Sequence, residues 1–178
     1  MNIVKTDFKD LLIINHEIYY DERGSFKEVF RKNVIEENLG YKINFCQDNN
    51  VKSSYMVLRG LHYQEEPYAQ SKLVSVAEGI ILDIAVDIWE NSKTYGKCFS
   101  CVLSSETNKS IFIPKGFAHG YLTLTSIADV NYKVDNYYNK NSEEGISFSD
   151  KNLNIDWGVD ENNLIISNKD KKFADFKW

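Results

Sequence analysis

Short runs of apolar and β-branched residues recur through the middle of the chain, separated by clusters of Gly, Asn and Ser. Strands recurring at such close intervals are typical of a sandwich or a barrel. We therefore expect an all-β fold, and a double-sheet jelly roll with a few short helices fits this length best. The runs predict strands at 43–49, 55–64, 72–79, 80–89, 98–104, 110–116, 118–125 and 128–134.

The N-terminal part has a more mixed pattern. Residues 11–20 are rich in β-forming side chains and are followed by a turn built on Gly24. Residues 26–30 then alternate apolar and charged side chains, which predicts a half-buried strand. The more polar tail after Asp150 is expected to mix turns with a short helix or strands.

Two glycines mark expected boundaries. Residues 33–39 predict a helix of one or two turns, with Asn33 as its N-terminal cap and Gly40 as its stop. Gly79 separates two apolar runs, which predicts a tight hairpin in which this glycine takes a positive φ.

Composition limits the class of protein. The chain has 178 residues, of which 43% are hydrophobic and 26% charged, so we expect residues 1–178 to form a single globular domain. The net charge of −5 argues against a nucleic-acid partner, because phosphate neutralisation needs clustered Lys and Arg. The first residues are charged where a signal peptide would be apolar, and no run is long enough for a membrane span. A cytoplasmic location without a membrane partner is therefore expected.

The cysteines do not indicate a metal site. Cys98 and Cys101 have a CxxC spacing, but no second pair completes a zinc site, and Cys46 leaves an odd total. We interpret all three as structural thiols.

The segment 58–72, LRGLHYQEEPYAQSK, has the strongest case for chemistry. Strand alternation places Gly60 and His62 on one face, with Arg59 and Leu61 on the other unless a bulge intervenes. A histidine facing a cavity titrates near neutrality and is a ready general base. The alternative is a core histidine whose ring nitrogens are satisfied by neighbours.

The basic residues around this segment have two interpretations. Arg59, Lys72 and Arg23 suit a phosphate or an oxyanion, although each is equally well a solvated surface charge. A catalytic metal is not expected, because His62 is followed by Tyr63 and Gln64, whereas metal-binding jelly rolls of this size use an HxH pair.

Three tyrosines at 132, 137 and 138 lie on a β-like run, where Tyr132 and Tyr138 have the spacing to share a face. A phenol can donate a proton, and its ring can stack on a base. The alternative is aromatic filling of the core. Asp170, taken alone, has the character of a surface charge.

A series of motifs follows in order along the chain: DERGSFKE at 21–28, FCQDNNVKSS at 45–54, VLRGLHYQ at 57–64, QSKLV at 70–74, GIILDIAVDI at 79–88, SKTYG at 92–96, IPKGFAHGY at 113–121, YKVDNYY at 132–138 and SNKD at 167–170. This series resembles the dTDP-4-dehydrorhamnose 3,5-epimerase family over nearly the whole chain. The combination of RGLHYQ, KLV and GFAHG is highly specific.

The resemblance implies a homodimeric jelly roll of the cupin type that needs no metal or organic cofactor. It implies inversion at C3 and C5 of a nucleotide-linked 4-keto-6-deoxyhexose, the substrate partner. His62 then corresponds to the base, Asp170 to the group that orients it, Tyr132 to the acid and Lys72 to the cation that stabilises the enolate. The positions that correspond to substrate binding are Arg23, Phe26, Glu28, Gln47, Asn49, Arg59, His119, Tyr138, Glu143 and Lys169.

Other functions stay open at this point. A relative on the same scaffold inverts one carbon only or accepts another nucleotide-ketohexose, and a keto-sugar isomerase is a third possibility. A non-catalytic jelly roll that binds a sugar nucleotide is a fourth, but such a protein is expected to have lost the base or its partner.

Overall fold

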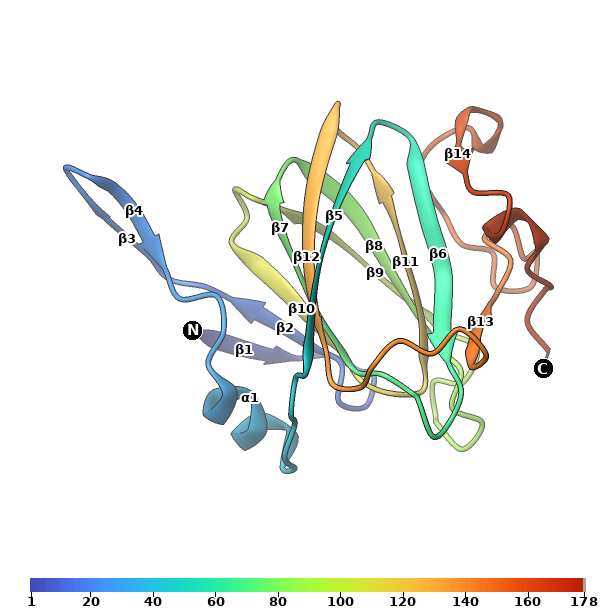
Figure 1. Cartoon of the computed structure of the whole chain (residues 1–178), viewed down its shortest axis with the longest axis horizontal. Coiled ribbons are helices and arrows are strands. Elements are labelled where there is room, and N and C mark those ends of the chain that lie inside the picture. The colour runs from blue at the N-terminus through green and yellow to red at the C-terminus, as the bar shows by residue number, and fades with distance from the viewer. Residues whose placement is uncertain (178) are drawn as a thin grey trace.

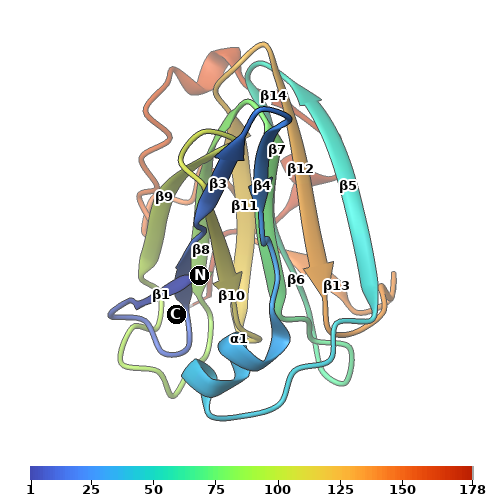
Figure 2. The ribbon, with the colours of Figure 1, turned by 90° about the vertical axis from the view of Figure 1, so that its left-hand side faces the viewer.

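The computed structural model describes residues 1–177 and consists of two packed sheets (Figures 1 and 2). Every ladder is antiparallel except the short β14–β6 pair. This confirms the double-sheet jelly roll. The first sheet has the order β1 (Asn2–Lys5), β2 (Leu12–Asn15), β10 (Lys109–Ile113), β7 (Lys72–Glu78), β12 (Ile127–Val134), β5 (Gln47–Ser54). The second has the order β13 (Glu143–Gly145), β6 (Val57–Gln64), β11 (Phe117–Thr123), β8 (Ile80–Asp87), β9 (Cys98–Ser104), with β14 (Ile165–Ile166) beside β6.

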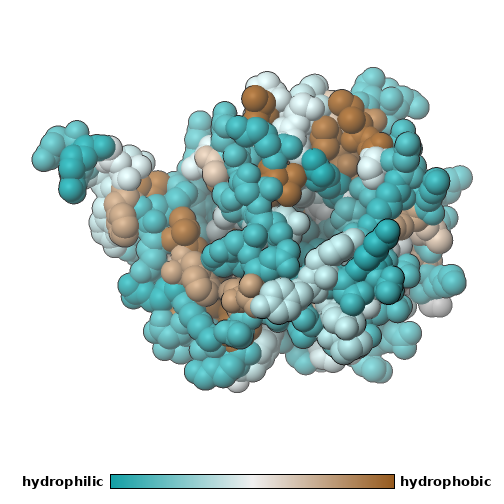
Figure 3. Space-filling model, viewed as in Figure 1, coloured by the Kyte–Doolittle hydropathy of each residue, from teal (hydrophilic) through white to brown (hydrophobic). Residues whose placement is uncertain are grey.

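Three short elements complete the N- and C-terminal parts. Helix α1 (Lys32–Leu39) covers one end of the first sheet, and two 3₁₀ turns, Glu161–Asn163 and Asp170–Lys172, lie in the tail. A separate hairpin of β3 (Ile18–Asp21) and β4 (Gly24–Lys27) pairs only with itself. This hairpin stands out from the body of the molecule (Figures 1 and 3).

The second sheet is buried on both faces. Ile81 and Ala85 of β8 point into the core between the sheets, whereas Ile84 and Val86 pack outward against Trp157 and the rest of the C-terminal segment. This double burial explains why β8 reads as an almost continuous apolar run. The C-terminal segment is thereby held against β6, which brings the tail next to one wall of the sandwich.

Gly79 does not form a hairpin, contrary to expectation. It takes the expected positive φ of 81°, but the strands it joins belong to different sheets: β7 pairs with β10 and β12, and β8 pairs with β9 and β11. A Cβ at this position would collide with the carbonyl oxygen of Ile127. The turn is therefore a crossing between the sheets.

The N-terminal boundaries are corrected in three places. The helix begins at Lys32 with Arg31 as its N-terminal cap, so Asn33 is not the cap, and Gly40 ends the helix with a φ of 80°. The second strand of the hairpin ends at Lys27, short of the expected 26–30. The strand expected at 43–49 begins only at 47, because Ile43 packs beneath α1 instead of joining the sheet.

Among residues 1–177, no helix combines the length and the apolar character needed to cross a membrane.

Candidate active site

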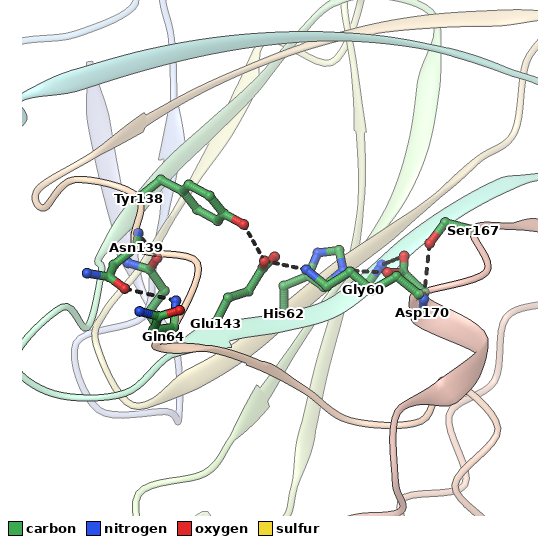
Figure 4. Close-up of polar contacts among 10 residues, drawn as sticks. Gly60, His62, Gln64, Tyr138, Asn139, Glu143, Ser167 and Asp170 are labelled. Atoms are coloured by element: carbon green, nitrogen blue, oxygen red, sulfur yellow. Dashed lines mark hydrogen bonds and ion pairs between the residues drawn. The ribbon is translucent and has the colours of Figure 1, made fainter.

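His62 is backed by a carboxylate from the C-terminal segment. Its Nε2 lies 2.9 Å from Oδ1 of Asp170, while the Gly60 backbone N–H donates to the other carboxylate oxygen (Figure 4). The His62 side chain is 30% exposed, and that of Asp170 only 6%. Burial by itself raises the pKa of Asp170. The hydrogen bonds from His62, Gly60 and Ser167 and the charge of His62 together outweigh this effect, so the pKa lies below its ordinary value. Asp170 is therefore an anion that orients the imidazole, not a surface charge.

A bulge in β6 puts Arg59 on the same face as His62. The β6–β11 register shifts between His119 and Tyr121, opposite Gly60. As a result Arg59 and His62 both line one cavity, whereas Leu61 packs outward against the C-terminal segment. Simple alternation, which placed Arg59 and Leu61 on a common face, is thus wrong here, since the extra residue of a bulge reverses the sides.

The cavity between the two sheets has a volume of about 240 Å³. Lys72, from the start of β7, extends across it and donates from Nζ to the backbone oxygen of His62 at 3.1 Å. Burial lowers the pKa of Lys72 to about 8, although Asp83 and Glu143 act in the opposite direction. Lys72 is thus a buried ammonium close to His62 rather than a solvated surface charge.

Tyr132 lies on the wall opposite His62. It comes from β12 of the first sheet, while His62 comes from β6 of the second, and both line the cavity. Burial raises the pKa of Tyr132, which keeps its phenol protonated at neutral pH. An acid and a base on opposite walls can reach opposite faces of one bound ring.

Tyr138 is fixed at the mouth of the cavity. Its hydroxyl donates to Oε2 of Glu143 at 2.6 Å (Figure 4). Lys169 forms an ion pair with the same oxygen. Tyr138 and Glu143 line the cavity with Tyr132, although Tyr138 follows the end of β12 instead of continuing the strand. Burial raises the pKa of Glu143, but Lys169 and Tyr138 outweigh it, so the net pKa is lowered.

His119 has a buried partner that sequence analysis missed. Its Nε2 lies 2.9 Å from Oδ2 of Asp83, whose side chain is fully buried and whose Oδ1 has no hydrogen-bond partner. Burial lowers the pKa of His119, although Asp83 opposes the effect. The available signal was a lone carboxylate inside the apolar run ILDIAV, where an acidic residue needs a partner.

Five of the residues expected to bind substrate do not line this cavity of their own chain. Arg23, Phe26 and Glu28 lie on or next to the projecting hairpin, where Arg23 pairs with Asp21 and Phe26 is 67% exposed. Gln47 and Asn49 lie on the edge strand β5 and are hydrogen-bonded to each other at 2.8 Å. Asn49 is nonetheless the register partner of Tyr132, so β5 continues the wall that carries the tyrosine.

The cysteines take no part in the cavity. Burial raises the pKa of Cys98 to about 11 and that of Cys101 further, so both thiols stay protonated. Within residues 1–177, no cluster of three or more His, Cys, Asp or Glu side chains has the arrangement to hold a metal ion.

Together, fold and cavity define a cupin-type jelly roll whose interior holds an imidazole and a phenol on facing walls. Residues 5–177 match the family model described as dTDP-4-dehydrorhamnose 3,5-epimerase. The chain belongs to the dTDP-4-dehydrorhamnose 3,5-epimerase family.

Individual relatives agree over nearly their whole length. The dTDP-4-dehydrorhamnose 3,5-epimerase of Shigella flexneri is 48% identical, with 98% of this chain and 97% of that protein aligned. The crystal structure of the enzyme of that name from Elizabethkingia anophelis superposes with a TM-score of 0.95 at 47% identity, covering 99% and 96% of the two chains. The dTDP-6-deoxy-D-glucose-3,5-epimerase from Legionella pneumophila, crystallised with dTDP-4-keto-L-rhamnose, has a TM-score of 0.92 at 44% identity, covering 98% and 92%.

Proposed function

We propose that this protein is an isomerase that inverts C3 and C5 of a dTDP-linked 4-keto-6-deoxyhexose, converting dTDP-4-dehydro-6-deoxyglucose to dTDP-4-dehydrorhamnose. The observation that carries the proposal is the placement of His62 and Tyr132 on opposite walls of one cavity, with Lys72 beside the base. Inversion at a carbon needs a proton removed from one face and returned to the other, which is the task that two facing groups can perform.

His62 removes a proton from a carbon next to the C4 ketone. Asp170 accepts a hydrogen bond from its ring and favours the imidazolium that forms, because the carboxylate is 2.9 Å away and stays ionised. The electron pair left on carbon moves to the C4 oxygen and gives an enolate. Lys72 offers a buried cation to that oxygen, where a fixed donor in a water-poor site contributes about 3–4 kcal/mol.

Tyr132 then returns a proton from the opposite wall. Burial raises the pKa of Tyr132, so the hydroxyl keeps its proton until the strongly basic enolate is there to accept it. One proton leaves and one is returned, so the step balances within the enzyme and its substrate. After this first inversion His62 carries the proton it removed and Tyr132 has lost its own, so His62 releases a proton to solvent and Tyr132 takes one up. The same sequence at the second carbon then completes the double inversion.

The nucleotide half of the substrate is assigned to the mouth of the cavity. Arg59 and Lys169 supply positive charge for a diphosphate, and the ring of Tyr138 is available to stack on thymine. Glu143 and His119 line the same space as ligand-contacting groups.

A second copy of the chain is proposed to complete the site. Arg23, Phe26 and Glu28 stand on or beside a hairpin that leaves the body of its own chain (Figure 1). In a homodimer this hairpin reaches the nucleotide bound by the partner subunit. An exposed aromatic and an arginine on a projecting hairpin suit such a contact better than they suit solvent. Gln47 and Asn49 lie on the edge strand β5, beside Tyr132, and are proposed to bind the nucleotide of their own subunit.

The principal alternative is inversion at one carbon only. The facing acid favours double inversion, since Tyr132 is present and buried in the cavity. A non-catalytic binding module is disfavoured because the His62–Asp170 pair is intact.

Incubation of the protein with dTDP-4-keto-6-deoxyglucose in D₂O distinguishes these functions. Deuterium at both C3 and C5 supports the proposal, deuterium at one carbon supports single inversion, and deuterium at neither supports a binding module. The His62→Ala variant should lose exchange at both carbons. Exchange near the wild-type rate in that variant would rule out His62 as the base.

A further inference from the structure

Gln64 uses its whole side-chain amide to hold backbone near the cavity. Its Nε2 donates to the carbonyl oxygens of Tyr68 and Tyr137 at 2.6 and 3.2 Å. Its Oε1 accepts from the Asn139 N–H at 2.7 Å (Figure 4). Gln64 is only 8% exposed. Replacing a buried amide with three specific backbone partners is costly, because the polar atoms of the side chain are themselves removed from water and depend on these hydrogen bonds.

Gln64 thus bonds to two loops, at 65–71 and at 135–139, and these loops are also joined directly to each other. Gln70 donates to the carbonyl oxygen of Asn136 at 2.7 Å, and the Asn136 amide donates to that of Pro67 at 2.9 Å. The Ser71 N–H donates to Asp135 Oδ1 at 2.6 Å. The loop at 65–71 and the loop at 135–139 are therefore held together by directional amide hydrogen bonds, and Gln64 lies at the centre of them.

Tyr138 lies between the two positions that Gln64 holds. Its neighbours Tyr137 and Asn139 both bond to the glutamine, and its hydroxyl bonds to Glu143, which is the register partner of Gln64 in the β13–β6 ladder. The ring of Tyr138 is itself largely exposed, so packing does little to place it. Its place is set by hydrogen bonds instead: its hydroxyl is held by Glu143, and its backbone is held on both sides by Gln64, which lies two residues beyond His62 on the same strand.

We propose that Gln64 is a positioning residue that sets the place of Tyr138 and thereby the affinity for the nucleotide half of the substrate. Gln64 lines the cavity with His62, but its amide is occupied by three backbone partners, so it acts through the loop. Because His62 and its partner Asp170 make no bond to Gln64, the chemical step is expected to be insensitive to it. The inference rests on the proposed function, in which Tyr138 contacts the nucleobase.

The Gln64→Glu variant provides the test. It keeps the size of the side chain and the acceptor for Asn139, but it removes both donors and sets a carboxylate against the Tyr68 and Tyr137 carbonyls. KM for the dTDP-sugar should rise about tenfold or more, with kcat changed less than about threefold. The affinity for thymidine diphosphate, measured by calorimetry, should fall by a similar factor.

Two further variants isolate the effect. Asn152→Asp makes the same amide-to-carboxylate change at an exposed site and should leave KM and kcat unchanged. Asn136→Asp removes only the donor to Pro67, so it should raise KM in the same direction by a smaller factor and keeps the test available should Gln64→Glu fold poorly. In a Tyr138→Ala background, Gln64→Glu should add little to KM, because the residue it positions is gone.

The proposal would be overturned by an unchanged KM in Gln64→Glu, by a loss confined to kcat, or by an undiminished effect in the Tyr138→Ala background. Failure of the proposed function is seen separately, as absence of deuterium exchange in the wild-type protein. In that case calorimetry with thymidine diphosphate still decides whether Gln64 controls the nucleotide site.

Discussion

His62 and His119 lie directly opposite each other in the β6–β11 ladder, and each is bonded through Nε2 to an aspartate at 2.9 Å. The two pairs differ chiefly in burial: His62 is 30% exposed, whereas His119 and its partner Asp83 are almost wholly enclosed. Burial lowers the pKa of His119 in spite of its carboxylate. Both histidines line the cavity and both have a carboxylate partner, but the imidazole of His62 is the more accessible of the two and that of His119 is the more deeply enclosed.

The Asp170→Asn variant should lose activity by roughly 10²–10⁴-fold in kcat, because the imidazolium formed at His62 loses its counter-charge. The loss should appear in deuterium exchange at both carbons. Near-normal exchange in this variant would contradict the orienting role of the carboxylate.

Asp170 should also contribute to acid sensitivity. Its pKa is below the ordinary 3.8 in the folded protein, so its stabilising contribution is present above that value and is lost as pH falls through the lowered pKa. Urea unfolding between pH 7 and pH 3 should show a shallower acid-side decline in Asp170→Asn than in the wild type. Parallel curves would contradict this.

Lys72 should produce opposite pH effects on activity and stability. As its ammonium deprotonates near pH 8, kcat/KM should fall by about tenfold per pH unit above that value. Stability should instead rise with pH between about 8 and the ordinary 10.5, since only the unfolded chain keeps its proton there. Lys72→Met should abolish that rise and lower kcat by about 10²–10³-fold. A wild-type activity that stays flat to pH 10 would exclude the cation as the enolate stabiliser.

Tyr132→Phe should separate the two halves of the reaction. Removal of the hydroxyl leaves the base, its carboxylate and Lys72 in place, so proton removal should continue while delivery from the opposite wall is lost. The rate at which inverted product forms should therefore fall by about 10²-fold or more. The rate at which deuterium from D₂O enters substrate that keeps its configuration should fall much less. Equal loss of the two would argue against Tyr132 as the acid.

Gly60→Ala should destabilise the fold by roughly 2–5 kcal/mol, measured by urea unfolding. Its φ is +131°, and a Cβ there would lie 2.5 Å from Gly120 Cα and 2.9 Å from the His119 carbonyl oxygen. Gly24 provides a matched control, with a φ of +122° but nothing within 4 Å, so Gly24→Ala should cost only about 1–3 kcal/mol of backbone strain. Equal losses would show that the close approach of β6 and β11 is unimportant.

The strands were largely predictable because their apolar runs are local and are bounded by turn residues. What local pattern could not supply was the sheet to which each strand belongs, and this is why the turn at Gly79 was wrongly expected to form a hairpin. The side of the sheet occupied by Arg59 was predicted only on the condition that no bulge intervenes, and local pattern could not show that one does. The bulge at Gly60 depends on its close contact with β11, which lies about sixty residues further along the chain.

The candidate site was predictable to the extent that it resides in motifs. His62, Lys72, Tyr132 and Tyr138 do share one cavity, but only the family resemblance connected them with Asp170, which alone has the character of a surface charge. Gln64 escaped notice because its partners are backbone carbonyls and an N–H, groups that every residue carries and that leave no trace in a sequence.

The carboxylate beside His62 comes from residue 170, after every strand of both sheets has passed. On the ribosome, where domains are built from the N-terminal side, the sheets can therefore assemble while the imidazole still lacks its counter-ion. The tail must dock on β6 before the site is complete. On the proposed mechanism, catalytic competence therefore depends on a contact that forms only after all strands of the two sheets have been synthesised.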